Sequence, residues 1–237
     1  MNSRPREARS NSCSNCVPRR ERPGLPSIIL EWCAEGDACG FVPGAAAIDA
    51  KWDKPAWRAV APLHIAHAMG EPPGHRPDTR VRIAYDEEAV YVIFRVEDRY
   101  VRSVATEHQK GEVSKDSCVE FLFTPGPDLG VGHFYLEMNC GGTMLFRFHG
   151  PDRVVTIPAS DYDPVTVAHS LPATVNQEIR EPVTWTLEYR LPVAVLHRHC
   201  AVVAPGPGVR WRANFYKCAD DSSHPHRRFT ERMLHEH

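Results

Sequence analysis

The stretch TRVRIAYDEEAVYVIFRVED at residues 79–98 decides the fold class, because its apolar side chains recur at every second position. In its second half Val90, Val92, Phe94 and Val96 share one parity, whereas Arg95 and Glu97 occupy the other. A period of two is typical of a β-strand with one face in a core. The acidic triplet at 86–88 divides the stretch, so we predict a hairpin with a tight turn there.

A second stretch, DSCVEFLFTPGPDLGVGHFYLEMN at residues 116–139, repeats this alternation. Val119 and Phe121 share the apolar parity, while Glu120 lies on the other. Buried charges are costly, so we expect the offset face of these strands to be solvated or functional. Strands are predicted at 27–33, 79–85, 89–97, 117–124, 133–139, 143–148, 183–191 and 209–217, one or two weak strands within 150–182, and one helical turn at 192–199.

Strands at this spacing, without long helices between them, predict an all-β protein. The expected architecture is an antiparallel β-sandwich with two sheets, of the immunoglobulin or jelly-roll-like type. Residues 1–26 lack an apolar period and are rich in Arg, Pro and Ser, so we predict a disordered N-terminal arm. Residues 27–226 form the predicted sandwich and residues 227–237 a polar tail, with no strand expected after residue 217. The two tryptophans within 48–60 predict a packed turn and a short helix at the sandwich edge.

The composition excludes several classes of function. The formal net charge of the 237 residues is −2, which gives no field that attracts nucleic acid or an anionic membrane. No run of about 20 apolar residues is present, so no membrane span is predicted. The N-terminal MNSRPREARS is not followed by an apolar segment, so no secretory signal is predicted.

The charged parity of the strands is the first candidate for function. Carboxylate, guanidinium and amide groups suit sugar hydroxyls, and an aromatic ring such as that of Tyr91 stacks on a pyranose. The alternative is an ordinary solvated face with cross-strand ion pairs. A glycoside hydrolase that uses Glu120 and Glu137 is a further alternative, because the sequence does not give their separation. The candidate ligand-binding residues are Arg95, Glu97, Glu120, Glu137, Asn139, Arg212, Asn214 and Tyr216.

Metal and haem sites have weaker patterns. Four cysteines have a faint zinc spacing, four histidines lie near the C-terminus, and several loop acids suit calcium. Scattered thiols and a polar tail are the plainer explanations of the first two, and the metal-binding residues stay unknown. A haem held by His133 and Met138 is the fourth option, although Met138 has the parity of a core residue. Cys118 and Cys140 lie near opposite ends of consecutive strands, which leaves a cross-strand contact open. The zinc and calcium candidates are Cys13, Cys16, Cys33, Cys39, His224, His226, His235, His237, Asp86, Glu87, Glu88 and Asp128.

Five segments together resemble the carbohydrate-binding family 9-like domains, whose β-sandwich is related to DOMON domains. They are IDAKWDKPAW (48–57), TRVRIAYDEEAVYVIFRVEDRYV (79–101), KDSCVEFLFTPGPD (115–128), YLEMNCGGTML (135–145) and WRANFYKCADDSSHPH (211–226).

This resemblance implies a non-catalytic module that binds poly- or oligosaccharides in support of polysaccharide breakdown. It implies that Glu120 hydrogen-bonds the terminal sugar and that Glu137 or Asn139 supplies a second polar group. It also implies two clamping rings, but residues 112–115 offer no aromatic, and Phe229 is the obvious substitute near the C-terminus. Structural calcium and an extracellular location are typical of the family. A haem-binding redox domain, a glycoside hydrolase and a scaffold domain without a ligand remain the alternatives.

Overall fold

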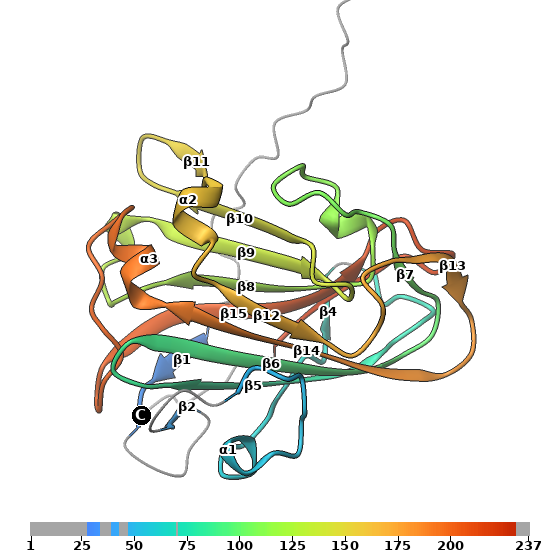
Figure 1. The fold of residues 1–237 in the computed structure, drawn as a ribbon, viewed down its shortest axis with the longest axis horizontal. Coiled ribbons are helices and arrows are strands. Elements are labelled where there is room, and N and C mark those ends of the chain that lie inside the picture. Colours follow the sequence, from blue (N-terminus) through green and yellow to red (C-terminus); the bar gives the residue numbers. More distant parts are fainter. Residues whose placement is uncertain (1–27, 34–38, 43–46, 70, 231–237) are drawn as a thin grey trace, which may run out of the picture.

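Two β-sheets pack face to face in the computed structural model of this chain, which describes residues 28–33, 39–42, 47–69 and 71–230 (Figure 1). The first sheet contains β1 (Ile28–Glu31), β4 (His67–Ala68), β8 (Cys118–Thr124), β9 (His133–Asn139), β10 (Met144–His149), β11 (Val154–Thr156), β15 (Arg210–Ala219) and β16 (His226–Phe229). Its order is β11-β10-β9-β8-β15-β16-β4, and β1 pairs with the other half of β15.

The second sheet contains β2 (Cys39–Phe41), β3 (Leu63–His64), β5 (Asp78–Tyr85), β6 (Ala89–Asp98), β12 (Thr166–His169) and β14 (Val183–Pro192), in the order β12-β14-β6-β5-β2 with β3 also on β5. A short ribbon of β7 (Val101–Ser103) and β13 (Val175–Ile179) lies at one end of the sandwich (Figure 1). The helical turns are α1 (Pro55–Arg58), η1 (Val113–Lys115), η2 (Leu129–Val131), α2 (Ala159–Tyr162) and α3 (Val193–His197). The predicted all-β sandwich is therefore confirmed, with one parallel pair, β2 and β5.

The core lies between the two sheets and uses the parity that the sequence predicts. In β6 of the second sheet, Val92 and Phe94 are at most 1% exposed. They belong to the same core as Phe121 and Phe215 of the first sheet. Rings stack through the centre of this layer, for example Phe121 on Phe215 with centroids 4.7 Å apart. Each buried aromatic removes a large apolar area from water, so this layer supplies most of the driving force for folding.

The predicted turn at 86–88 forms because Asp86 satisfies the backbone of the hairpin. Its carboxylate accepts hydrogen bonds from the amides of Glu88 and Ala89 at 2.9 and 2.8 Å, and from the Tyr91 hydroxyl at 2.7 Å. An aspartate that bonds to the backbone two and three residues onward closes a turn. The carboxylate of Asp86 is thus committed to the fold.

A buried carboxylate fastens the segment 47–60 onto the outer face of the second sheet. Glu188 of β14 accepts hydrogen bonds from the backbone amides of Asp49 and Ala50 and from the Trp57 indole, the last at 2.9 Å. It also forms an ion pair with Lys54 Nζ at 2.5 Å. Trp57 then packs over Tyr91 and Ile93, which the sequence placed on the offset face of β6. The predicted turn and helix exist, and they cover a sheet face.

A polar cluster is buried at one end of the core. Lys217 of β15 is fully buried and lies 3.3 Å from Asp98 Oδ2 and 2.9 Å from His226 Nε2. Asp98 also contacts His75 Nε2 at 2.6 Å. Burial by itself would raise the pKa of Asp98, but the charge of Lys217 and the His75 bond lower it to about 2. We call these four residues the Lys217 cluster.

Two predictions about strands differ from the structure. A strand does follow residue 217: β16 pairs with the second half of β15, so the expected polar tail begins inside a sheet. The sequence concealed it because its inward side chains, His226 and Arg228, are polar and bond to buried groups instead of packing as hydrophobes. Three short strands, β11, β12 and β13, occupy the stretch 150–182, where one or two were expected. The predicted helical turn after residue 192 is α3.

Candidate functional site

A continuous row of side chains crosses the outer face of the first sheet. Strand register places Glu120 of β8 directly opposite Glu137 of β9 on one side and Tyr216 of β15 on the other. The row continues through register pairs to further strands at both ends. We call it the carboxylate row, and its members in order are His67, Phe229, Tyr216, Glu120, Glu137 and Leu145.

A disulfide lies beside the two carboxylates in the next row of the same face. Cys118 and Cys218 are register partners on β8 and β15, with Cα atoms 5.2 Å apart, and they are bonded. Cys218 Sγ lies 3.0 Å from Glu120 Oε1, and Cys118 Sγ lies 3.4 Å from Glu137 Oε1. The open question of a contact between Cys118 and Cys140 is thereby settled, since the partner is Cys218 and Cys140 is a buried free thiol.

Both carboxylates are buried, so of the two expectations for the charged parity, solvated or functional, the first does not hold at these two positions. Glu120 and Glu137 are each 2% exposed, because Val113 of η1 and Leu145 pack with the disulfide at this end of the row. Burial, together with the neighbouring charge of Glu120, raises the pKa of Glu137 to about 8. The raised pKa favours the protonated form of Glu137, and a protonated carboxyl group beside a carboxylate offers both a donor and an acceptor.

Three partly exposed side chains border the carboxylates. The Tyr135 hydroxyl donates to Glu137 Oε2 at 3.1 Å, and Arg227 Nη2 lies 3.7 Å from Glu120 Oε1 and 2.8 Å from Asp220. The Phe229 ring lies 6.3 Å from that of Tyr216 and 5.4 Å from that of His67. An aromatic edge beside charge-assisted donors and acceptors is the composition that polar ring-shaped ligands need.

The structure brings five of the eight predicted ligand-binding residues onto this face in or near the row. Glu120, Glu137 and Tyr216 belong to the row, and Asn139 and Asn214 flank it in buried positions. Asn139 holds the 104–116 segment through Asp116 and Ala105, and the Asn214 side-chain oxygen accepts a bond from Phe215 N at 2.9 Å. These two amides carry structural bonds.

The other three predicted residues lie apart from the row. Arg95 and Glu97 sit on β6 of the second sheet, where they form an ion pair at 2.6 Å, so the expectation of a single charged face is wrong for them. The sequence alone does not say which strands share a sheet. Arg212 is on the same face as the row but four residues from Tyr216 along β15, which is about 13 Å at the usual strand rise. It is exposed at the β1 end.

The structure also shows where several of the candidate metal and haem ligands lie. Met138 packs in the core, whereas His133 lies on the opposite face of β9 and stacks on His149, so the two do not face one haem. Asp128 caps η2 by accepting from Gly130 N, and His226 belongs to the Lys217 cluster. Cys13, Cys16, His235 and His237 lie outside the described residues. Among the residues that the structure describes, four donors that suit a metal gather within 4.8 Å of one another: Cys118, Cys218, Glu120 and Glu137.

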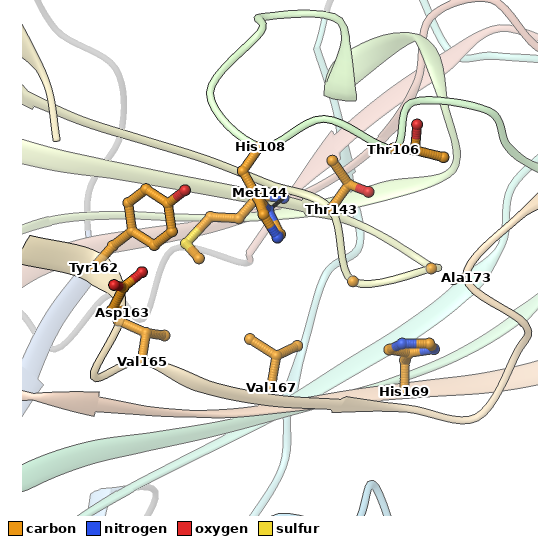
Figure 2. A pocket seen from close by; sticks show the side chains of 12 residues that line it. Thr106, His108, Thr143, Met144, Tyr162, Asp163, Val165, Val167, His169 and Ala173 are labelled. Atoms are coloured by element: carbon orange, nitrogen blue, oxygen red, sulfur yellow. Dashed lines mark hydrogen bonds between the residues drawn. The ribbon is translucent and has the colours of Figure 1, made fainter. Parts of the chain in front are cut away.

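A separate cleft of about 510 Å³ opens between β10 and β12. In Figure 2, Val165, Val167 and His169 point from the β12 side towards Met144, His108 and Thr143. His108 accepts the Met144 amide on Nδ1 at 3.0 Å, and His169 Nδ1 lies 2.6 Å from the Leu171 carbonyl. Tyr162 and Asp163 complete one end of the cleft (Figure 2). Its size falls within the range of small-molecule sites, so it is the second candidate location.

Sequence reasoning missed Tyr135, Arg227 and the disulfide. Tyr135 has the parity of Glu137, so alternation already placed it on the same face. Arg227 and Cys218 depend on β16 and on a register between strands about 100 residues apart, for which the sequence gives no signal.

Comparisons with known proteins agree with this fold. The family model described as carbohydrate-binding family 9 matches residues 58–231. The crystal structure of a "putative carbohydrate-binding protein" from Bacteroides uniformis superimposes with a TM-score of 0.72 at 22% identity, covering 86% of this chain and 94% of that one. A search of curated proteins finds no match.

Two structures of a family 9 module from Caldicellulosiruptor kristjanssonii also match. The complex with glucose has a TM-score of 0.51 at 14% identity and covers 80% of this chain and 83% of that one. The complex with cellotriose has a TM-score of 0.51 at 13% identity, with 81% and 82% covered. These likenesses show the fold, and the family model spans most of the sequence. Four of the five quoted segments lie within the matched residues, and the segment 48–57 lies just before them. The resemblance is thus confirmed: this chain is a carbohydrate-binding module that belongs to carbohydrate-binding family 9.

Proposed function

We propose that this module binds its carbohydrate over the carboxylate row, at the edge formed by Phe229, Tyr135 and Arg227. The observation that carries the proposal is the row itself, which aligns two carboxylates with aromatic rings across five neighbouring strands. Tyr135 and Arg227 are half-buried beside the two acids, so their polar atoms are held by the carboxylates and remain partly open to a ligand.

In this proposal the sugar stacks on the Phe229 ring and its hydroxyls bond to the polar groups beside it. Glucose and cellotriose, which are bound by the Caldicellulosiruptor module, are the first ligands to test. Burying a Phe side chain against a ligand is worth about 1.5–3 kcal/mol. Phe229→Ala is therefore expected to weaken binding by about 10- to 100-fold.

Calorimetric titration of the full chain with glucose, cellotriose and xylobiose tests the location. Phe229→Ala and Tyr135→Phe are expected to weaken binding, whereas Tyr162→Phe in the β10–β12 cleft and Arg95→Gln on the second sheet are expected to leave it unchanged. Loss of binding in Tyr162→Phe with normal binding in Phe229→Ala would place the sugar in the cleft instead. Absence of heat from the folded wild type across a broad glycan panel would favour the scaffold alternative.

The arrangement of the two acids favours binding over glycoside hydrolysis. Their oxygens lie within 4.8 Å of each other and each contacts a cysteine sulfur. Retaining glycosidases hold their two carboxyl groups about 5–5.5 Å apart on either side of the scissile bond, and inverting enzymes hold them farther apart. Here the acids stand side by side on adjacent strands. Turnover of aryl glycosides that disappears in Glu120→Gln would contradict this conclusion.

A further inference from the structure

The four donor side chains around the disulfide have a chemistry that sugar binding does not use. Cys118 and Glu120 come from β8, Glu137 from β9 and Cys218 from β15, and strand register alone brings them together. Their ligand atoms all lie within 4.8 Å of one another, and all four residues are buried. Three central strands of the same sheet thus hold two sulfurs and two carboxylates in a fixed, compact group.

We propose that this group is a zinc site when the disulfide is reduced. An external dithiol supplies two electrons and two protons, which convert the cystine to two thiols while the dithiol becomes a disulfide. Zn²⁺ then displaces the two thiol protons and any proton on the two carboxyl groups, which pass to the solvent, and is bound by two thiolates and one oxygen from each carboxylate. The proposal shares Glu120 and Glu137 with the row over which the sugar is proposed to bind, but its test measures metal alone and needs no sugar.

The geometry is compatible with tetrahedral zinc. Zn–S bonds of about 2.3 Å and Zn–O bonds of about 2.0–2.2 Å place neighbouring donor atoms about 3.3–3.8 Å apart. The contacts of 3.0 Å between Cys218 Sγ and Glu120 and of 3.4 Å between Cys118 Sγ and Glu137 are already close to these values. The sulfurs must separate, and Cα atoms 5.2 Å apart permit this by rotation of the side chains.

The surroundings suit a structural zinc site in charge and in orientation. Two thiolates and two carboxylates carry the same charge as the four thiolates of a Cys₄ zinc site. Tyr135 donates to Glu137 Oε2, and Arg227 approaches Glu120, which are contacts that orient metal-bound carboxylates. Val113 and Leu145 supply the apolar shell. Sulfur donors favour zinc over calcium or magnesium, which take oxygen ligands.

Cobalt binding to the full chain tests the site. Co²⁺ is added under anaerobic conditions to the reduced and to the oxidised protein. Absorption spectra then record the thiolate-to-cobalt charge-transfer bands and the d–d bands of tetrahedral cobalt. Zn²⁺ affinity follows from displacement of the bound cobalt. We expect the reduced wild type to hold one more equivalent of metal than the oxidised protein.

Two sets of substitutions test whether the additional metal ion is bound by the four donor residues Cys118, Glu120, Glu137 and Cys218. Glu120→Gln combined with Glu137→Gln keeps every cysteine, so the other thiols of the chain contribute equally in both proteins. Loss of outer contacts to metal ligands costs about 10- to 100-fold in affinity, so replacing both ligands should weaken binding at least about 10-fold. The control variant combines Cys33→Ser with Cys200→Ser and so removes two half-buried thiols that are not among the four donors. It should bind metal as the wild type does.

Three results would overturn the proposal. Equal binding by the wild type and the double glutamine variant would assign the metal to other thiols. A loss of the bound equivalent in the control variant would do the same. Unfolding of the reduced chain, seen by circular dichroism, would mean that the four donors never meet in the dithiol state.

Discussion

The Lys217 cluster is expected to make the stability of this module sensitive to mild acid through His226. The Nδ1 proton of His226 is donated to the His224 carbonyl at 2.9 Å, and Nε2 accepts from Lys217 Nζ at 2.9 Å. The ring is therefore held neutral. Burial and the charge of Lys217 lower the pKa of His226 from 6.5 to about 3.

The sign and size of the effect follow from proton linkage. Above pH 6.5 His226 is neutral in both states and its contribution is fully present. As the pH falls below 6.5, His226 becomes protonated in the unfolded chain but stays neutral in the native state. The free energy of unfolding therefore decreases by up to about 1.4 kcal/mol per pH unit. At pH 6.5 the unfolded histidine is already half protonated, so between pH 6.5 and 4.5 the expected loss is about 2.3 kcal/mol, and the loss ends near pH 3.

Urea denaturation of the wild type and of His226→Gln at a series of pH values measures this contribution. The glutamine side-chain oxygen replaces Nε2 as the acceptor for Lys217 and does not titrate. The free-energy difference between the two proteins should therefore shift by about 2.3 kcal/mol in favour of the variant between pH 6.5 and 4.5. His64→Gln, at an exposed position on β3, controls for the loss of a histidine outside the cluster. Parallel curves for the wild type and His226→Gln would refute the reasoning.

Three further changes have defined outcomes. Glu188→Ala leaves the donors of residues 49, 50 and 57 without their acceptor, so urea denaturation should show a loss of about 3–5 kcal/mol, partly recovered in Glu188→Gln; a loss under 1 kcal/mol would contradict this role. Ala50 has φ 58°, so Ala50→Gly should raise the thermal midpoint by relieving about 1 kcal/mol of strain. Gly142 has φ 87°, and a Cβ added there would lie 2.8 Å from the His169 ring, so Gly142→Ala should lower the midpoint. The reverse order of the two midpoints would be inconsistent with the backbone described. Reduction of the disulfide between residues 118 and 218, which are 100 positions apart, should cost about 2–4 kcal/mol in metal-free buffer, measured by urea denaturation with and without reductant, and an unchanged midpoint would argue against it.

Alternation made much of the sheet predictable from the sequence. The strands around Phe94 and Phe121 follow the predicted parity, because a strand between solvent and core must place apolar groups at every second residue. The same rule located Glu120 and Glu137 on the side of their own strands that faces away from the core. It also concealed β16, whose inward His226 and Arg228 break the apolar pattern.

The limits of prediction at the candidate site have a definite cause. Parity says which side of its own strand a residue occupies, and nothing about which strands are neighbours. Arg95 and Glu120 therefore seemed to share a face, although the first lies on the second sheet. The charged parity was expected to be solvated or functional, and at Glu120 and Glu137 it is not solvated, since Val113 and Leu145 cover the acids.

The sequence by itself determined the all-β class, the positions of the long alternating strands, their core-facing residues and the family, because these depend on local periodicity and on motifs within single segments. Only the tertiary structure decided that β8, β9 and β15 are neighbours in a register that sets two carboxylates beside a disulfide. It also decided that Lys217 and Asp98 neutralise each other inside the core. Those contacts join residues about 20 to 120 positions apart. The first group is fixed by strand register within the first sheet, and the second contact is fixed by how the two sheets pack.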